Sequence, residues 1–171
     1  MRLLVVTDSF RGGVGALATE HVRRLSEWAE VVLVGPESQA DQLPPDIEAL
    51  LLDLPRSFLG CLRRGAVGSL RNAIRDAQPD LIHAHGNRSF ILVRLGGAQC
   101  WVTMHGFGRL PGTPAWKAVI QSTVRRLVPL LTKHAFSVAP HAPRGWTFLA
   151  LHNPGCSRGL KPPDSSSDLA M

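Results

Sequence analysis

The sequence has no tyrosine, only three cysteines, and no aspartate or glutamate between positions 81 and 163. The cysteines, Cys61, Cys100 and Cys156, are far apart and form no C-x-x-C pair, so we expect neither a disulfide framework nor a cysteine zinc site, and a cytoplasmic, reducing compartment is favoured. Aromatic residues make up only 6% of the chain, which argues against a nucleic-acid partner read by base stacking. No apolar run approaches the roughly 20 residues of a membrane-spanning helix.

Because acidic residues are absent from 81–163, two parts of the chain differ strongly in net charge. Residues 1–80 carry 9 basic and 11 acidic side chains, a net charge of −2, whereas residues 81–163 carry 10 basic and no acidic ones, a net charge of +10. A surface of this kind attracts phosphates or acidic lipid headgroups. It also means that no carboxylate from 81–163 can act as a general base or ligate a metal.

Short apolar runs alternate with amphipathic segments along the chain, which predicts an α/β fold with a parallel sheet. The expected strands are 2–7, 31–34, 47–54, 81–85, 99–105, 135–139 and 147–151, and the expected helices are 15–29, 63–77, 89–95 and 113–131. We therefore predict a Rossmann-like, open, mainly parallel sheet of six or seven strands with helices on both faces. The length fits one domain over residues 1–155, followed by a flexible tail or truncated interdomain linker over 156–171.

Two helices of this prediction have defined apolar stripes. Trp28 falls on the apolar face of the helix at 15–29, and Val119, Leu127 and Leu131 fall on that of the helix at 113–131. Such stripes usually pack against the sheet of their own domain.

A glycine-rich turn follows the first expected strand. RGGVG at 11–15 contains Gly12, Gly13 and Val14 and opens a helix, where bare backbone and free N–H groups can approach a phosphate. The segment lacks the spacing G-x-G-x-x-G, which disfavours a dinucleotide-binding domain. In an open α/β sheet ligands bind at the carboxyl ends of the strands. Asn153, after the last expected strand, belongs to the same candidate edge.

The segment HAHG ends the expected strand at 81–85. His83 and His85 have the spacing of metal-dependent hydrolases, and Gly86 follows them. A catalytic metal needs further ligands, often carboxylates, which this half of the chain lacks. We therefore favour a hydrogen-bonded pair of histidines at the strand end and expect no metal.

The segment TMHG places His105 and Gly106 at the end of the next strand. A neutral imidazole there could orient or deprotonate a hydroxyl group. Asp8, at the end of the first strand, is the acid that could lie beside it.

The basic residues suggest an anion or membrane surface. Those concerned are Arg63, Arg64, Arg71, Arg125 and Arg126. An interfacial role at an acidic membrane follows if these side chains share a face. A non-catalytic Rossmann-like module that binds a protein partner or an acidic membrane is therefore the alternative to an enzyme.

The order of the motifs resembles the N-terminal domain of the family 4 (group 1) glycosyltransferases, which have the GT-B fold. The matching segments are GGVGALATEHVRRLSEWAEVVLVGP at 12–36, PDLIHAHG at 79–86, VTMHG at 102–106 and HNPG at 152–155. Each motif is modest alone, but their order and spacing over residues 1–155 are specific.

The resemblance implies a two-domain enzyme that moves a sugar from a nucleotide-sugar donor to an acceptor. In this family the glycine loop, here Gly12 and Gly13, lies near the donor phosphates, and the histidine of the T-x-H-G segment, here His105, lines the catalytic cleft. Such enzymes generally retain the anomeric configuration and use no active-site metal or other cofactor. Many act on lipid-linked acceptors, peripherally attached to the inner face of the membrane.

The sequence also departs from the family. It lacks the paired glutamates of the E-x7-E motif, which belong to the second domain, and the segment before HNPG is short. We therefore expect little turnover without a C-terminal domain, supplied in cis or in trans.

Overall fold

The computed structural model describes residues 1–55, 57, 59–105, 114, 119, 122–123, 126–128, 130–132, 134–137 and 147–148. Its elements are β1 (Arg2–Thr7), α1 (Gly12–Leu25), β2 (Glu30–Pro36), η1 (Glu37–Gln42), β3 (Ala49–Leu52), η2 (Leu59–Leu62), α2 (Arg64–Ala77), β4 (Leu81–His85), α3 (Asn87–Leu95), β5 (Trp101–Met104), β6 (Ala135–Ser137) and β7 (Thr147–Phe148).

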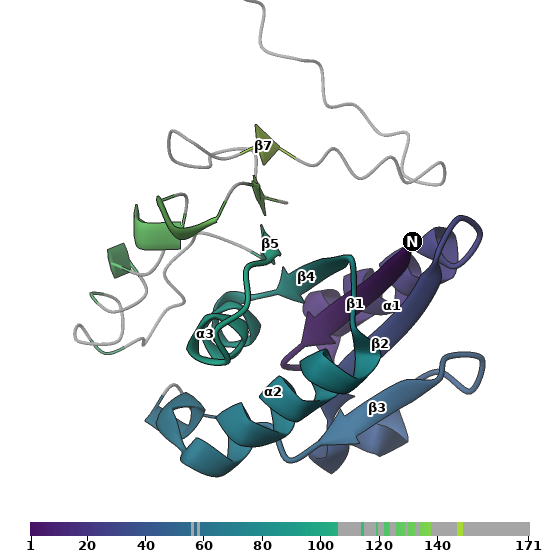
Figure 1. Ribbon diagram of the computed structural model, residues 1–171, viewed down its shortest axis with the longest axis horizontal. Coiled ribbons are helices and arrows are strands. Elements are labelled where there is room, and N and C mark those ends of the chain that lie inside the picture. The colour runs from purple at the N-terminus through teal and green to yellow at the C-terminus, as the bar shows by residue number, and fades with distance from the viewer. Residues whose placement is uncertain are drawn as a thin grey trace, which may run out of the picture.

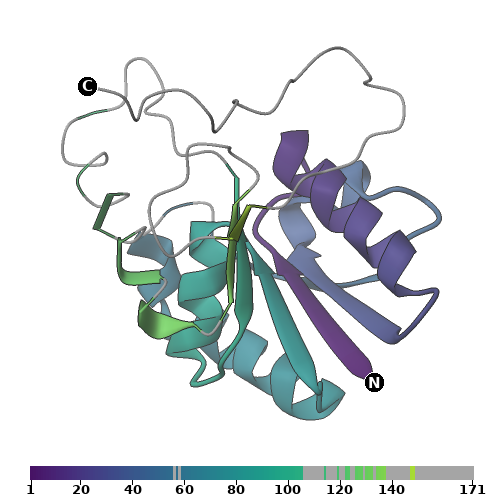
Figure 2. The same cartoon turned by 90° about the horizontal axis from the view of Figure 1, so that it is seen from above.

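The strands form one sheet of seven in the order β3-β2-β1-β4-β5-β6-β7 (Figure 1). Every neighbouring pair is parallel. Helices cover both faces, as Figure 2 shows with α1 on one side of the sheet and α2 and α3 on the other. The predicted Rossmann-like α/β fold is confirmed.

The alternation of side chains along β1 builds a core on each face of the sheet. Leu3 and Val5 pack with Val22 of α1 on one face. Leu4 and Val6 pack with the buried side chains of α2 and α3 on the other. A central strand covered on both faces must be apolar at every position, which explains the unbroken run LLVV.

The helix expected at 15–29 begins earlier and ends earlier. It runs from Gly12 to Leu25, and Trp28, expected on its apolar face, is 83% exposed. The N–H groups of Trp28 and Ala29 bond to the carbonyl of Leu25 in a turn, because the chain must reverse here to enter β2 beside β1.

The other element boundaries differ by a few residues. The sequence predicted that this strand ends at residue 34. β2 instead continues through Gly35 and ends at Pro36, and a proline is tolerated at the end of a strand. The short 3₁₀ helices η1 and η2 were not predicted.

The helix predicted at 113–131 lies mostly outside the described residues. Among the positions that are described, Val128 is buried, whereas Val119, Leu127 and Leu131 are exposed. The expectation that these three pack against the sheet is therefore wrong. The boundary predicted after residue 155 also lies outside the described residues.

Within the described part of the chain, no helix is both long and apolar enough to span a bilayer. Cys61 and Cys100 are buried, free thiols. Burial raises the pKa of Cys100 to about 12, so this thiol is protonated and inert at neutral pH.

Candidate active site

The carboxyl ends of β1, β4 and β5 lie side by side at one edge of the sheet. Thr7 of β1 is in register with His85 of β4, and His85 with Thr103 of β5. The sheet extends from β1 through β2 on one side and from β4 through β5 on the other, so the topological switch point lies between β1 and β4. Ligands of open α/β sheets bind at this crevice.

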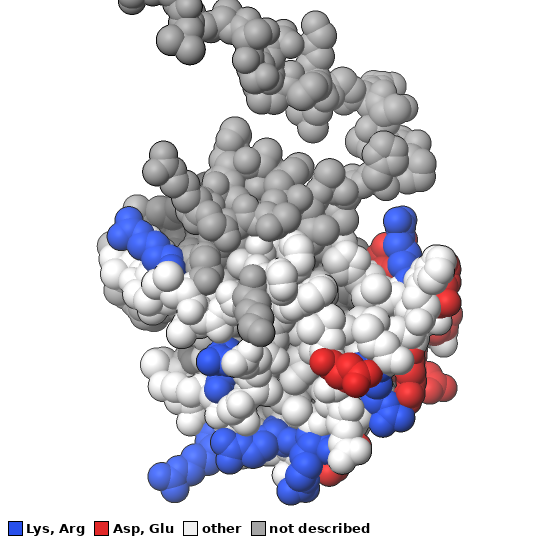
Figure 3. Space-filling model, turned by 45° about the horizontal axis from the view of Figure 1, so that its top comes forward, with Lys and Arg blue, Asp and Glu red and all other residues white. Residues whose placement is uncertain are grey.

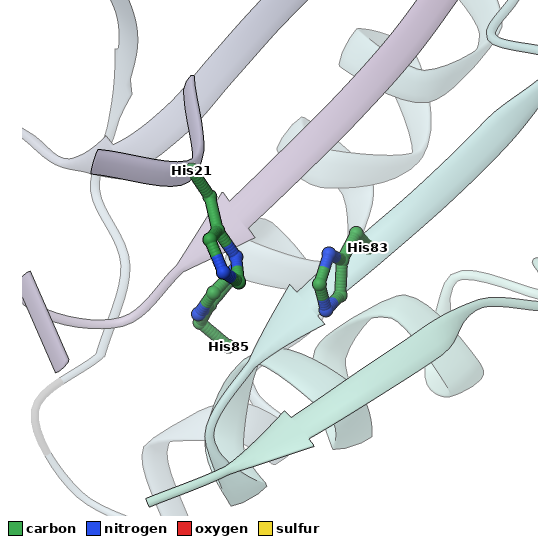
Figure 4. A group of neighbouring side chains, drawn as sticks. All are labelled: His21, His83 and His85. Atoms are coloured by element: carbon green, nitrogen blue, oxygen red, sulfur yellow. The ribbon is translucent and has the colours of Figure 1, made fainter. Parts of the chain in front are cut away.

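Three histidines meet at this crevice, on the face of the sheet that α1 covers (Figure 4). Val5 packs toward α1 and is in register with His83. Residues two apart in a strand share a face, so His83 and His85 both point toward α1. His21 extends from α1 to meet them, and one ring nitrogen of each histidine lies within 4.8 Å of the other two.

His85 connects this group to the end of β5. Its Nε2 lies 3.3 Å from Nδ1 of His21, and its Nδ1 lies 3.3 Å from Nε2 of His105. A neutral imidazole donates from one nitrogen and accepts at the other. His21, His85 and His105 therefore form a row of hydrogen bonds in which the tautomer of each ring depends on its neighbour. If one ring exchanges its donor and acceptor nitrogens, the other two must exchange theirs as well.

His83 has a different partner. Its Nε2 lies 2.8 Å from the hydroxyl oxygen of Thr103, and its ring centroid lies 4.5 Å from that of His85. The pair at the strand end is thus confirmed as neighbours on one face, but each ring hydrogen-bonds to a third residue, so the interpretation that the two bond to one another is wrong. The two residues are two positions apart on β4 and share one face, where their rings lie 4.5 Å apart at an interplanar angle of 37° without a hydrogen bond between them.

Burial keeps these imidazoles neutral. Loss of solvation, reinforced by the neighbouring histidines, lowers the pKa of His83 to about 3 and that of His85 well below its ordinary value. Burial and His21 lower the pKa of His105 to about 4. Burial also lowers the pKa of His21, with a contribution from Arg24. At neutral pH all four side chains can accept a hydrogen bond or a metal.

The glycine loop lies at the start of α1, after the carboxyl end of β1. Gly12 has φ +62°, which a residue with a side chain rarely adopts, and a Cβ atom on Gly12 or Gly13 would meet no atom within 4 Å. Arg11, at the N-cap, makes no side-chain cap, and the first turn holds no acidic residue. The first N–H groups of α1 are therefore available to an anion approaching through open space.

Gly86 connects β4 to α3 at the same edge. Its φ is +87°, and its N–H donates to the carbonyl of Thr103 at 2.8 Å. The carboxylate of Asp8 lies beside it, and a Cβ on Gly86 would be 3.6 Å from Oδ2 of Asp8. That oxygen accepts from Nε of Arg88 at 2.8 Å. Asp8 therefore forms an ion pair with Arg88, and the suggestion that Asp8 partners His105 is wrong. The reason is that α3 begins close to Asp8, so the guanidinium of Arg88 in its first turn reaches the carboxylate.

Two buried polar atoms at the start of α3 have no partner in the described part of the chain. They are Oδ1 of Asn87 and Oγ of Ser89. Ser89 is completely buried. Buried polar atoms are almost always hydrogen-bonded, so these two are suited to a water or a ligand hydroxyl.

The structure brings together most of the site residues predicted from the sequence. Those at the carboxyl edge of β1, β4 and β5 are Gly12, Gly13, Val14, His85, Gly86 and His105. Gly106 and Asn153 lie outside the described residues.

Sequence reasoning missed His21. The signal was present, because Leu17, His21 and Leu25 recur at four-residue spacing and so share one helix face. A histidine in the middle of an apolar stripe faces the sheet. His83 and His85 are two residues apart in β4, so both point to one face of the sheet, and His21 meets them on that face.

The basic residues predicted as a patch are only partly described. Arg63, Arg64 and Arg71 are exposed at and within α2, and Arg126 is exposed, whereas Arg125 lies outside the described residues. Figure 3 shows basic side chains gathered along the lower edge of the molecule and acidic ones at its right. Nε of Arg71 also donates to the carbonyl of Gly96 at 3.1 Å.

Two surface hollows lie at the other edge of the sheet, where the strands begin. One is lined by Arg2, Glu30 and Asp80, among others, and the second by Leu81 and Trp101. Neither hollow is lined by a histidine of the cluster at the carboxyl edge.

Comparison with solved structures shows that the chain shares its fold with domains of larger proteins. It superposes on UDP-N-acetylglucosamine 2-epimerase from Rickettsia bellii with a TM-score of 0.57 and 11% identity, covering 85% of this chain and 40% of the epimerase. A second UDP-N-acetylglucosamine 2-epimerase gives 0.56 and 17%, covering 83% and 43%. The glycosyltransferase SsfS6 from Streptomyces sp. SF2575 gives 0.46 and 15%, covering 87% and 53%. The chain thus spans about two fifths of the length of the two epimerases.

No curated protein matches the sequence. The family described as the glycosyl transferase 4-like domain matches residues 12–145, which is most of the chain. The match runs from the glycine loop through His85 and His105. The resemblance found in the motifs is confirmed, and the chain belongs to the glycosyl transferase 4-like family.

Proposed function

We propose that the chain is the N-terminal, acceptor-side half of a retaining glycosyltransferase that moves a sugar from a nucleotide-sugar to a sugar or lipid-linked acceptor. The observation that carries the proposal is that Gly12, Gly86 and His105 all follow the carboxyl ends of the adjacent strands β1, β4 and β5. Family membership supports the reaction class. The nucleotide-sugar is a co-substrate, and no cofactor takes part in the transfer.

The start of α1 is suited to the donor diphosphate. Gly12 and Gly13 leave open space above the backbone, and the uncapped N–H groups carry the positive end of the helix dipole. A side chain at either position would fill the space that a phosphate needs.

His105 is suited to a hydroxyl of the reacting sugar or the acceptor. Its pKa of about 4 keeps it neutral, so it can bond to a hydroxyl without carrying charge. His85 holds its Nε2, which leaves Nδ1 for the substrate. The unpartnered oxygens of Asn87 and Ser89 are candidates for further hydroxyl contacts.

Sugar transfer in this proposal takes place between two domains. The described residues supply one wall of the cleft, and a second Rossmann domain, in cis or in trans, supplies the other wall with most of the donor contacts. The chain by itself then binds nucleoside diphosphates weakly and transfers little sugar.

Nuclear magnetic resonance on the 171-residue chain tests the location of the site. Titration with a nucleoside diphosphate should shift the backbone signals of Gly12, Gly13 and Gly86 and leave those of Arg2 and Trp101 at the opposite edge unchanged. Shifts confined to the opposite edge would overturn the proposed site. Rapid sugar transfer by the chain alone would overturn the requirement for a second domain, and an inverted product anomer would overturn retention.

An exposed apolar and basic surface favours a second, compatible function at an acidic membrane. Leu59 and Leu62 of η2 are 73% and 63% exposed, and Arg63 and Arg64 follow directly. Exposed leucines beside arginines are typical of surfaces that insert shallowly among anionic headgroups.

Vesicle sedimentation tests this second function. Wild-type protein should sediment with vesicles that contain an anionic phospholipid and not with purely zwitterionic ones. The double variant Leu59→Ser and Leu62→Ser should lose sedimentation, whereas Arg2→Ala, at the other end of the sheet, should keep it. Equal sedimentation with both kinds of vesicle would contradict an electrostatic membrane surface.

A further inference from the structure

The histidine cluster at the switch point has a second chemical capacity. Its three members come from two segments that are 62 residues apart or more, which no local motif requires. We propose that His21, His83 and His85 form a binding site for one divalent transition-metal ion, with Zn²⁺ as the favoured ion.

The separation of the ligand atoms suits tetrahedral coordination. With Zn–N bonds of about 2.05 Å, two nitrogens of a tetrahedral site lie about 3.3–3.4 Å apart. Nδ1 of His21 and Nε2 of His85 are 3.3 Å apart. No two ligand atoms in the group are more than 4.8 Å apart, so the remaining adjustment is at most about 1.5 Å, which rotation of the side chains can supply.

The second nitrogen of each strand histidine is already held. Thr103 holds Nε2 of His83, which leaves Nδ1 as its ligand atom, and His105 holds Nδ1 of His85, which leaves Nε2. Metal-binding histidines almost always use their other nitrogen in this way, which fixes the ring and its tautomer. Figure 4 shows the rings of His21 and His85 close together and the ring of His83 turned toward them.

The chemistry of the group decides the class of metal. Three neutral imidazoles without a carboxylate suit Zn²⁺, Cu²⁺ and Ni²⁺ and disfavour Mg²⁺ and Ca²⁺, which need oxygen ligands. Three protein ligands leave a fourth position for water, and His21 is only half-buried, so the ion can enter past α1.

The expectation that the chain binds no metal rested on the lack of carboxylates between positions 81 and 163. The third ligand is instead a histidine from the acidic half of the chain. A bound ion would cross-link α1 to β4 and would require Nδ1 of His85 to donate to His105, so it would both stabilise the fold and set the tautomer of His105.

The test is a titration of the chelator-treated 171-residue chain with Zn²⁺ in competition with a chromophoric chelator. It is made in a Cys156→Ser background, so that the Cys156 thiol cannot be the ligand. We expect one equivalent to bind and the melting temperature to rise. His21→Gln should weaken binding at least about ten-fold and abolish the rise.

The matched control replaces His134, His141 and His152, none of which belongs to the proposed site or bonds to it in the proposal, by glutamine. This variant should bind Zn²⁺ like the parent. If it loses binding, or if His21→Gln keeps the parent affinity, the proposed site is wrong.

A measurement on the parent protein keeps the proposal testable should His21→Gln fold poorly. Imidazole nitrogen resonances of His21, His83 and His85 should shift on addition of one equivalent of Zn²⁺, whereas that of His134 should not. Unshifted cluster resonances at saturating Zn²⁺ would overturn the proposal.

Discussion

Nδ1 of His85, the last residue of β4, lies 3.3 Å from Nε2 of His105, the first residue after β5. This contact joins the two histidine motifs of the sequence into one site. It also orients His105, because the ring nitrogen that bonds to His85 is not free for substrate. In the proposed function, the remaining nitrogen of His105, Nδ1, is therefore the one available to a substrate.

The first prediction concerns the role of His105. In the complete enzyme, His105→Ala should lower kcat by about 10²-fold or more, the usual contribution of a positioned acid–base or hydrogen-bonding side chain. Steady-state kinetics check this, and denaturant unfolding of the same variant should show a retained cooperative transition. His134→Ala, at an exposed site, is the control, and unchanged turnover of His105→Ala would remove it from the mechanism.

The second prediction concerns acid stability. The folded pKa values of His83 and His105 are about 3 and 4, whereas an unfolded histidine titrates near 6.5, so the unfolded chain takes up protons first as the pH falls. The free energy of unfolding should be constant above about pH 7 and fall below it, by about 2 kcal/mol for each histidine at pH 5.

Denaturant unfolding of chelator-treated protein at several pH values measures this loss. His105→Gln should flatten the pH dependence, because glutamine does not titrate. A parent protein as stable at pH 5 as at pH 7 would contradict the neutral cluster.

The third prediction concerns the ion pair between Asp8 and Arg88. The side chain of Asp8 is 8% exposed, so Arg88→Ala leaves a carboxylate almost buried without its guanidinium. We expect a loss of about 2–4 kcal/mol in unfolding free energy. Arg24→Ala, which removes an exposed ion pair with Glu20 within α1, is the matched control and should have little effect. Equal effects of the two variants would show that burial does not matter at Asp8.

The fourth prediction separates folding from binding at the glycine loop. Gly12→Ala should destabilise the chain by about 1 kcal/mol, because φ is +62°. Gly13→Ala lies inside α1 without that conformation, so it should leave stability unchanged or raise it by up to about 1 kcal/mol.

Both variants should nevertheless weaken nucleoside diphosphate binding, since each Cβ enters the space above the helix start. Calorimetric unfolding and ligand titration together check the pair. Unweakened binding by Gly13→Ala would place the phosphate elsewhere.

The fold class and the edge of the sheet that carries the site could both be predicted from the amino-acid sequence. The run LLVV and the strand at 81–85 are apolar because both faces of a central strand are covered, and a parallel sheet puts glycine turns and histidines that follow strands on one edge. These local features predicted Gly12, Gly13, His85, Gly86 and His105 together. The ends of helices and strands were predicted less accurately, as the exposed Trp28 shows. A helix ends where the chain must turn toward the next strand, and the position of that strand is set by the whole fold.

Which side chains contact one another depends on how the helices pack on the sheet. His21 lies 62 residues before His83, and their meeting depends on α1 covering the face toward which His83 and His85 point. The choice of Arg88 over His105 as the partner of Asp8 likewise depends on where α3 begins after Gly86. Composition and spacing carry no information about these contacts, because the register between strands and the face chosen by each helix are set by packing.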